Sequence, residues 1–318
     1  MIFTVIENIF VMFIFILIGF FIRKKNIIDD YTANGISKIL INISIPAAIV
    51  SSMISQPFEI QRLGNIGFLI IVTVSSFFIF LFFGILVAKF LNISYDRVGI
   101  YACSITFSNV AFMGIPIIAS IWGYNGVFYI SIANIPFFIL VPIAASLFIK
   151  GKSEKSKFKL DINVMASLIG FLIYISQNYT PLFILDFIRP TIINGVGGGS
   201  LGRILSQLSQ LMTPLSMFFI GSSLAKNKIS DIIIDKSICW LLFIKLIFLP
   251  LITLFFIRLF IYDEIVIGVL TMKTAMPTAA LVAVFVNQKN SDTVYSSHII
   301  FLTTLFSLIT IPFITLFL

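Results

Sequence analysis

The chain has 318 residues, of which 59% are hydrophobic and 11% are charged, and its mean hydropathy is +1.12. Roughly a quarter of the residues in a soluble domain are charged, so this composition excludes an ordinary soluble enzyme or binding domain. The apolar residues come in runs of about twenty, long enough to cross the hydrocarbon core of a membrane. They lack the alternation of a membrane β-barrel strand. The composition therefore predicts an all-α polytopic membrane protein.

Charges and turn residues divide the chain into ten predicted transmembrane helices. In chain order these spans cover residues 3–22, 33–55, 65–88, 97–120, 125–149, 162–178, 204–225, 237–261, 264–287 and 294–316. The basic segment 150–161 separates a first five-helix repeat, residues 1–149, from a second one, residues 162–318. Because each repeat has an odd number of spans, we expect the second repeat to be inverted in the membrane.

Lysine and arginine are distributed unevenly among the connecting segments. With the N-terminus outside, fourteen of the 21 basic residues fall in cytoplasmic segments, four in outer segments and three within spans. This asymmetry follows the positive-inside rule. It predicts a multi-pass protein of the cell membrane with a cytoplasmic loop at residues 150–161. The net charge of +8 is thereby explained by topology, and no nucleic-acid partner is expected.

Two proline-containing stretches lie deep inside predicted spans. Residues 109–116 read Asn-Val-Ala-Phe-Met-Gly-Ile-Pro, and residues 273–277 read Lys-Thr-Ala-Met-Pro. An interior proline removes a backbone hydrogen bond, and lipid cannot replace it. Paired breaks in corresponding positions of two repeats are typical of transporters. We therefore expect helices 4 and 9 to be broken at Pro116 and Pro277 and to cross there.

The expected crossing has the chemistry of an anion site. Half-helices starting after Pro116 and Pro277 would present unpaired N–H groups and the positive ends of helix dipoles, which suit a carboxylate. Gly114 would allow close helix approach. Asn109 could donate its amide to a substrate or to a neighbouring helix. Lys273 could attract an anion, cap carbonyls freed by the proline, or extend to the membrane surface.

The remaining ionisable residues narrow the function. We expect Lys245 and Lys38 to lie nearer the ends of their spans and to extend toward the membrane surface. No aspartate or glutamate falls inside a predicted span, which argues against an antiporter with a buried carboxylate relay. The single histidine and two cysteines, His298, Cys103 and Cys239, suggest neither a metal site nor a disulfide framework. No cofactor is expected.

In these residues the chain resembles the auxin efflux carrier family, which includes bacterial malate and malonate permeases and the plant PIN-FORMED carriers. The most specific match is the string from Asn109 to Ile118. More moderate matches follow in chain order at residues 35–46, 214–225, 245–250 and 275–277. The resemblance covers essentially the whole chain. One departure is that residues 161–164, Asp-Ile-Asn-Val, lack the proline frequent where span 6 begins in this family.

The resemblance implies two inverted five-helix repeats, a scaffold of spans 1, 2, 6 and 7, and a transport domain formed by the other spans. It also implies export or exchange of an organic anion by an elevator-like movement, often as a homodimer. By the same resemblance Asn109, Pro116 and Pro277 line the substrate site, with Ile45 and Pro46 on the scaffold side.

These observations predict a secondary carrier for a small organic anion, such as a mono- or dicarboxylate. A sodium-coupled carrier resembling the bile-acid symporters has the same architecture and remains an alternative. An intramembrane enzyme would need a nucleophile–base pair or a metal cluster, for which the sequence offers no candidate. A plain channel would not require paired breaks in an inverted repeat.

Overall fold

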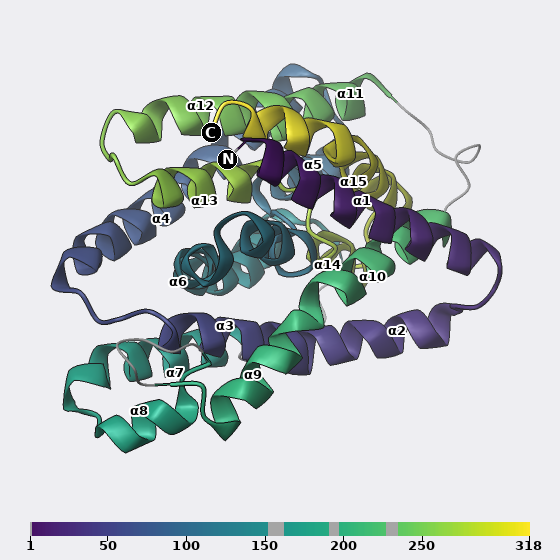
Figure 1. The fold of residues 1–318 in the computed structure, drawn as a ribbon. Helices are drawn as coiled ribbons and strands as arrows, with labels where there is room; N and C mark the ends of the chain where they lie inside the picture. Colours follow the sequence, from purple (N-terminus) through teal and green to yellow (C-terminus); the bar gives the residue numbers. More distant parts are fainter. Residues whose placement is uncertain (1, 152–161, 191–196, 227–234) are drawn as a thin grey trace. The chain divides into compact units, whose positions relative to one another are not determined.

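The computed structural model describes residues 2–151, 162–190, 197–226 and 235–318, and these residues form helices and no strand (Figure 1). The elements are α1 (Ile2–Lys24), α2 (Asp30–Ile39), η1 (Leu40–Ser44), α3 (Ile45–Ile54), α4 (Ile60–Phe90), α5 (Tyr95–Thr106), η2 (Val110–Gly114), α6 (Ile115–Phe148), α7 (Ile162–Ser176), η3 (Gln177–Tyr179), α8 (Leu182–Ile188), α9 (Ser200–Gln210), α10 (Met212–Lys226), α11 (Lys236–Phe243), η5 (Ile244–Phe248), α12 (Leu249–Arg258), α13 (Glu264–Ala275), α14 (Leu281–Gln288) and α15 (Thr293–Thr315).

Five helical stretches within the described ranges are long and apolar enough to cross a membrane. They are Asp30–Ile54, Ile60–Phe90, Val110–Phe148, Lys236–Arg258 and Thr293–Thr315. Their number, length and apolar composition are typical of a multi-pass membrane protein. Other helices, such as α5 and α13 with 12 residues each, end at breaks within apolar sequence. The count of ten spans stays a prediction. Most of the basic loop, residues 152–161, lies outside the described residues.

The label α6 covers two helical segments joined at Gly123. This glycine has φ 56° and ψ −143°, a backbone conformation that is not helical and that residues with a Cβ rarely adopt. It falls between the fourth and fifth predicted spans, residues 97–120 and 125–149. The turn expected from the sequence is therefore present at Gly123.

The chain folds into two compact units. Unit 1 comprises Met1–Ile70, Ala111–Ile135 and Leu160–Lys226. Unit 2 comprises Ile71–Val110, Pro136–Lys159 and Asn227–Leu318. Each unit thus draws on both halves of the sequence.

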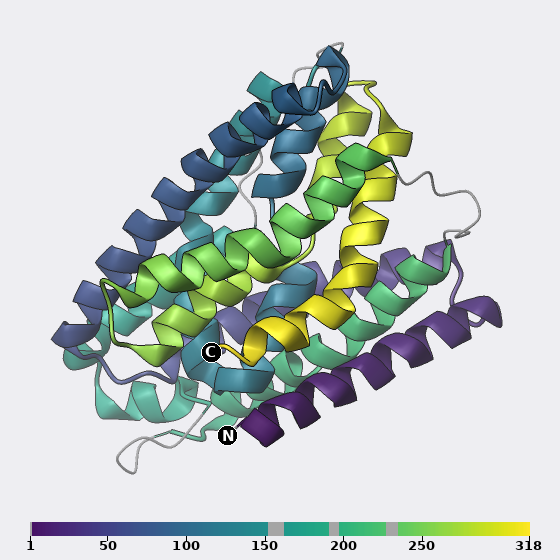
Figure 2. The same cartoon turned by 90° about the horizontal axis from the view of Figure 1, so that it is seen from above.

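In unit 1, α1 packs along α10 (Figure 2), and α3 packs against α7. The α1–α10 packing is close because Gly221 has no side chain; a Cβ there would collide with the carbonyl oxygen of Ile16. Small residues let membrane helices approach in this way. The two helix pairs join predicted spans 1 and 7 and predicted spans 2 and 6. Exchanging the two halves of the sequence converts one pair into the other, as expected for a chain built from two repeats.

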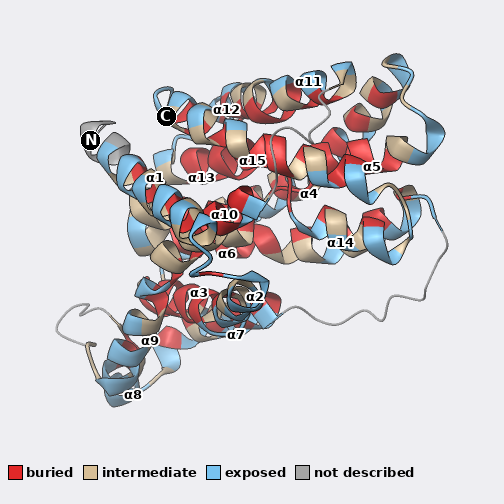
Figure 3. Cartoon of the chain, turned by 90° about the vertical axis from the view of Figure 1, so that its right-hand side faces the viewer, coloured by how far each residue is buried: buried red, intermediate tan, exposed pale blue. Residues whose placement is uncertain are grey.

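In unit 2, α13 forms the centre. Every residue from Val266 to Ala275 is buried, and Figure 3 shows α13 in the colour of buried residues over most of its length. A helix buried on all sides needs neighbours on all sides, and α12 and α15 pack against it. By contrast, α4 carries large exposed apolar side chains such as Phe78 and Phe82, as expected for contact with lipid.

Three five-residue π-helical turns, η1, η2 and η5, each end two residues before a proline: Pro46, Pro116 and Pro250. A proline has no N–H to give to the preceding turn of an α-helix. A widened turn accommodates the missing bond without ending the helix. These prolines therefore shape their helices without interrupting them.

Candidate functional site

Two helices of unit 2 end inside apolar sequence. Helix α5 ends at Thr106, and Phe107 follows with extended backbone, φ −85° and ψ 111°. Helix α13 ends at Ala275, and Met276 follows with φ −64° and ψ 145°. Met276 is extended because the ring of the next residue, Pro277, disfavours the helical conformation of its predecessor.

The two interruptions pair with each other through their main chains. Ser108 and Thr278 form an isolated antiparallel bridge. The amide of Asn109 donates to the carbonyl oxygen of Pro277 at 2.8 Å, and the amide of Ala279 donates to the carbonyl oxygen of Phe107 at 2.9 Å. A pair of broken helices thus meets within unit 2 at residues that are far apart in the sequence.

The position expected for the first break was wrong. The interruption lies at residues 107–109, whereas Pro116 is the second residue of α6 and follows η2. Proline is tolerated near the start of a helical segment, where its missing N–H is not needed. The wider turn of η2 accommodates the hydrogen bond that the preceding helical turn lacks. Pro277 does lie in the second break, as expected. The crossing of helices 4 and 9 at the two prolines, in the form expected, stays a prediction.

Fewer backbone amides are unpaired at the breaks than the sequence led us to expect. Besides the two bonds across the breaks, the amide of Val110 donates to the carbonyl oxygen of Ser108 at 2.9 Å, and that of Thr278 donates to Oγ1 of Thr303 at 3.2 Å. Buried N–H groups are costly when unpaired, and the extended segments can satisfy each other. Two donors that the sequence seemed to offer to a ligand, the amides of Thr278 and Ala279, therefore hold the breaks together.

Lys245, on η5, binds the first break. Its Nζ donates to the carbonyl oxygen of Ile105 at 2.8 Å and to Oγ of Ser108 at 2.7 Å, and the residue is 1% exposed. In an unbroken helix the Ile105 carbonyl would accept from Asn109, whose amide here bonds Pro277 instead. The expectation that Lys245 extends to the membrane surface was therefore wrong. The break leaves the Ile105 carbonyl oxygen without its helical donor, and the Lys245 ammonium donates to it instead.

Threonine side chains satisfy further polar groups of the breaks. Oγ1 of Thr278 donates to the carbonyl oxygen of Ser104 at 2.9 Å. Oγ1 of Thr303, on α15, accepts from the Thr278 amide and donates within its own helix to the carbonyl oxygen of Ile299 at 2.8 Å. The breaks are thus supported from α15 as well as from η5.

Lys273 lies on α13, one turn before Pro277, and is 6% exposed. Its Nζ donates to Oγ1 of Thr73 at 3.3 Å and lies 5.2 Å from the centre of the Phe137 ring. Neither contact is to a carbonyl freed by the proline. Among the described residues, no carboxylate forms an ion pair with Lys273 or Lys245.

Three phenylalanine rings gather beside Lys273 and the first break. Phe77 stacks on Phe107 with ring centres 5.9 Å apart, and Phe137 meets both rings edge-on at 6.0 and 6.3 Å. Phe107 is itself the first residue of the break. A buried cation and an apolar aromatic wall therefore occur side by side.

The residues expected to form the site divide between the two units. Asn109, Lys273 and Pro277 belong to unit 2, where Asn109 and Pro277 are hydrogen-bonded through their main chains. The other expected residues belong to unit 1, and these are Ile45, Pro46, Gly114 and Pro116. Asn109 is half-buried, while Lys273 and Pro277 are buried.

Sequence reasoning missed several residues that contact the breaks or Lys273, namely Thr73, Ser108, Phe137, Thr278 and Thr303. Their roles depend on contacts between distant segments, which no local pattern reveals. Lys245 was visible as a charge inside an apolar run, which by itself indicates a function. Its depth could not be judged without knowing that a neighbouring helix is broken beside it.

The sequence profile of the membrane transport protein family matches this chain twice, over residues 4–161 and over residues 159–315. An uncharacterized transporter of Methanothermobacter thermautotrophicus (strain Delta H) is 21% identical over 313 residues, which cover 96% of each chain. The doubled match accounts for nearly the whole sequence. The chain therefore belongs to the membrane transport protein family, whose members are transporters of the auxin efflux carrier type.

Proposed function

We propose that this transporter is a secondary carrier for a small organic anion, such as a mono- or dicarboxylate, and that the anion binds beside the paired breaks of unit 2. One observation carries the proposal: Lys245 and Lys273 are both buried beside the breaks without an acidic partner among the described residues. A buried ammonium in a membrane protein is costly and usually functional.

The surroundings of Lys273 favour an organic anion over a simple inorganic one. Thr73 supplies one neutral oxygen, and the Phe77–Phe107–Phe137 cluster supplies an apolar surface next to the charge. A carboxylate could lie at the ammonium while its carbon skeleton contacts the rings. Asn109 follows the break and is suited to donate its amide to the same carboxylate.

Because several backbone amides are already paired, we assign charge attraction chiefly to the lysines. The start of α14 and the start of η2 would add the weaker field of helix N-termini. Lys245 holds its own break together, so it would act mainly through its charge. Lys273 has fewer hydrogen bonds in this structure and is the better candidate for direct substrate contact.

We further propose alternating access by an elevator-like movement of unit 2 against unit 1. In support, unit 1 contains predicted spans 1, 2, 6 and 7, which the family resemblance assigns to the scaffold, although it also takes in residues 111–135. Unit 2 contains both breaks. We place the N-terminus outside the cell membrane on the basis of the lysine and arginine distribution, and a homodimer is compatible with this scheme.

Counterflow in proteoliposomes tests the substrate class. The purified protein is reconstituted with each of several internal anions, including malate, malonate and an indole acid, and uptake of the labelled anion is measured. Asn109→Ala and Lys273→Met should lower kcat/KM about 10- to 100-fold, the loss expected when a hydrogen bond to a charged group is removed. Lys38→Met, which removes an exposed lysine from a span, is the matched control. Wild-type rates in both site variants would remove the assignment.

The same vesicles address coupling to sodium. In carriers with broken helices, freed carbonyl oxygens coordinate sodium. Here the ammonium of Lys245 occupies such an oxygen, that of Ile105. We therefore expect uptake to be independent of a sodium gradient. Uptake that requires sodium would favour the symporter alternative.

A further inference from the structure

A pocket of about 560 Å³ lies at the ends of three helices of unit 2 and shares no residue with the helix breaks. Its walls come from the last turns of α4, the turn that follows, the first turns of α5 and the end of α6. Since α4 and α6 are apolar helices that end here, the pocket lies at the level of the lipid headgroups, whichever side of the membrane it faces.

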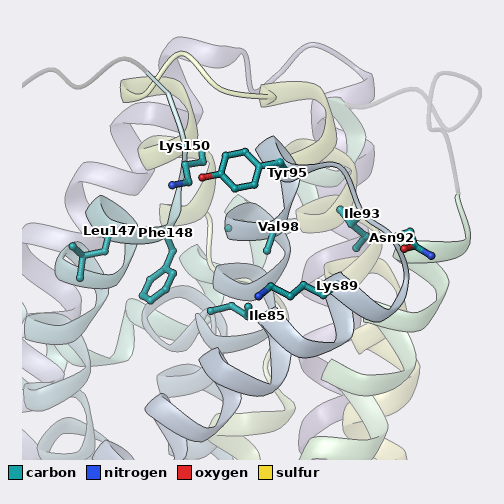
Figure 4. Close-up of a pocket in the computed structure, with 10 residues that line it drawn as sticks. Ile85, Lys89, Asn92, Ile93, Tyr95, Val98, Leu147, Phe148 and Lys150 are labelled. Carbon is teal, nitrogen blue, oxygen red and sulfur yellow. The ribbon is translucent and has the colours of Figure 1, made fainter.

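Both charged residues that line the pocket are lysines, Lys89 and Lys150. Figure 4 shows the Lys89 amine pointing toward Ile85 and Phe148, while Lys150 lies across the pocket beside the Tyr95 ring. The Nζ of Lys150 is 5.0 Å from the centre of that ring. In the described part of the chain neither lysine forms an ion pair. Two cations thus share one pocket, and no carboxylate of the described residues lines it.

Much of the remaining lining is apolar, apart from Asn92 and the Tyr95 hydroxyl. Val98, Leu147 and Phe148 contribute hydrocarbon surface. At Gly99 helices α5 and α6 touch, since a Cβ there would collide with the carbonyl oxygen of Phe148. A ligand in this pocket therefore meets both positive charge and hydrocarbon.

Large apolar side chains continue from the pocket onto the outer surface. Leu147 is 66% exposed and Tyr95 is 72% exposed. Both residues also line the pocket itself. Aromatic residues at this level typically contact the membrane interface. An occupant with a negative headgroup and an attached acyl chain would cover both the lysines and these residues.

We propose that this pocket binds the phosphate-bearing headgroup of an anionic phospholipid, with an acyl chain lying along Leu147. Basic pockets between transmembrane helices bind such headgroups in other membrane proteins. A soluble phosphate compound would use the lysines but would leave the exposed apolar flank uncovered. The proposal does not depend on which anion the protein transports.

The test uses the purified full-length protein in a neutral detergent and measures its thermal unfolding midpoint during lipid titration. Dioctanoyl phosphatidylglycerol should raise the midpoint in a saturable way, whereas dioctanoyl phosphatidylcholine should do so only weakly. The variant Lys89→Gln/Lys150→Gln should bind phosphatidylglycerol roughly 25-fold more weakly, about fivefold for each lysine near an anionic lipid surface. Lys89→Arg/Lys150→Arg should retain the effect, because the charges are kept.

A second double variant distinguishes binding at this pocket from general attraction of the lipid to positive charge on the protein surface. Lys24→Gln/Lys25→Gln removes the same charge from exposed lysines at the end of α1 and should leave the phosphatidylglycerol response unchanged. Equal losses in the two glutamine variants, or equal responses to the two lipids, would overturn the proposal. Glycerol 3-phosphate or inorganic phosphate that stabilises the protein as well as phosphatidylglycerol would also overturn it, in favour of a soluble ligand.

Discussion

The ammonium of Lys245 bonds a carbonyl oxygen and a hydroxyl oxygen, where a buried lysine would ordinarily be expected to find a carboxylate. Its acceptor at Ile105 exists only because α5 ends one residue later. The lysine therefore stabilises the break and at the same time brings a positive charge to it. Lys38, in contrast, is an exposed lysine near the start of a predicted span.

Replacing Lys245 by methionine should destabilise the protein and also slow transport. Methionine keeps the apolar volume of the side chain but leaves the Ile105 carbonyl without its bond, a loss of about 1–3 kcal/mol. Thermal unfolding in detergent measures the first effect and counterflow the second. Lys38→Met should change neither. A Lys245→Met protein with wild-type stability would show that the ammonium does not hold the break.

At the scale of elements, each break is held by contacts with other helices. Thr278 illustrates this, because its hydroxyl donates to the Ser104 carbonyl on α5. Thr274 is a buried threonine near the end of α13, but its hydroxyl donates to the carbonyl of Thr271 within its own helix, at 2.7 Å. The two threonines thus differ mainly in which helix they bond.

This difference gives a matched pair of substitutions. Thr278→Val should cost about 1–3 kcal/mol, since a buried carbonyl loses its donor, and should lower the thermal midpoint. Thr274→Val removes a bond within one helix and should cost less than about 1 kcal/mol. Equal effects on unfolding would mean that the pairing of the breaks contributes nothing special to stability.

The sequence predicted the second break and misplaced the first for a local reason. Pro277 forces Met276 out of the helical region, and this effect acts between neighbours. Pro116 does not break its helix, because the wider turn η2 before it accommodates the missing hydrogen bond. The actual break begins at Phe107, which has no proline beside it. That break depends on the pairing of Ser108 with Thr278, 170 residues later in the sequence. A pattern within one span could not reveal it.

At the scale of the whole molecule, composition alone predicted an all-helical membrane protein, and the runs and proline spacing predicted a doubled architecture. The doubled family match agrees with the latter. The resemblance grouped predicted spans 1, 2, 6 and 7, and unit 1 contains them. What could not be predicted is that unit 1 also takes in residues 111–135, toward the end of the first half, and that both α4 and α6 contribute to both units. Such grouping follows from packing between distant segments.

One long-range ion pair also links stability to pH. Arg97, near the start of α5, lies 2.7 Å from Asp292, which caps α15 by accepting from the Tyr295 amide at 2.9 Å. Burial acts to raise the pKa of Asp292, but the bonds from the Tyr295 amide and from Arg97 outweigh it and leave the pKa below its ordinary value of 3.8. The carboxylate therefore adds stability above that value, and the contribution is lost as the pH falls through the lowered pKa.

Asp292→Asn tests this linkage, because asparagine keeps the helix cap but carries no charge. The wild-type protein should have the higher thermal midpoint near neutral pH. The difference between the two proteins should shrink as the pH is lowered through the Asp292 pKa. A difference that stays constant with pH would contradict the assigned role of the charge.

The joint between the two breaks has an evolutionary consequence. The Asn109–Pro277 and Phe107–Ala279 bonds join main-chain atoms, so they persist when the side chains of Phe107 or Asn109 are exchanged. In the proposed carrier, such exchanges would alter the surface that meets the substrate and leave these main-chain bonds unchanged. The proposal therefore predicts that relatives with different substrates differ at these positions and keep the main-chain pairing.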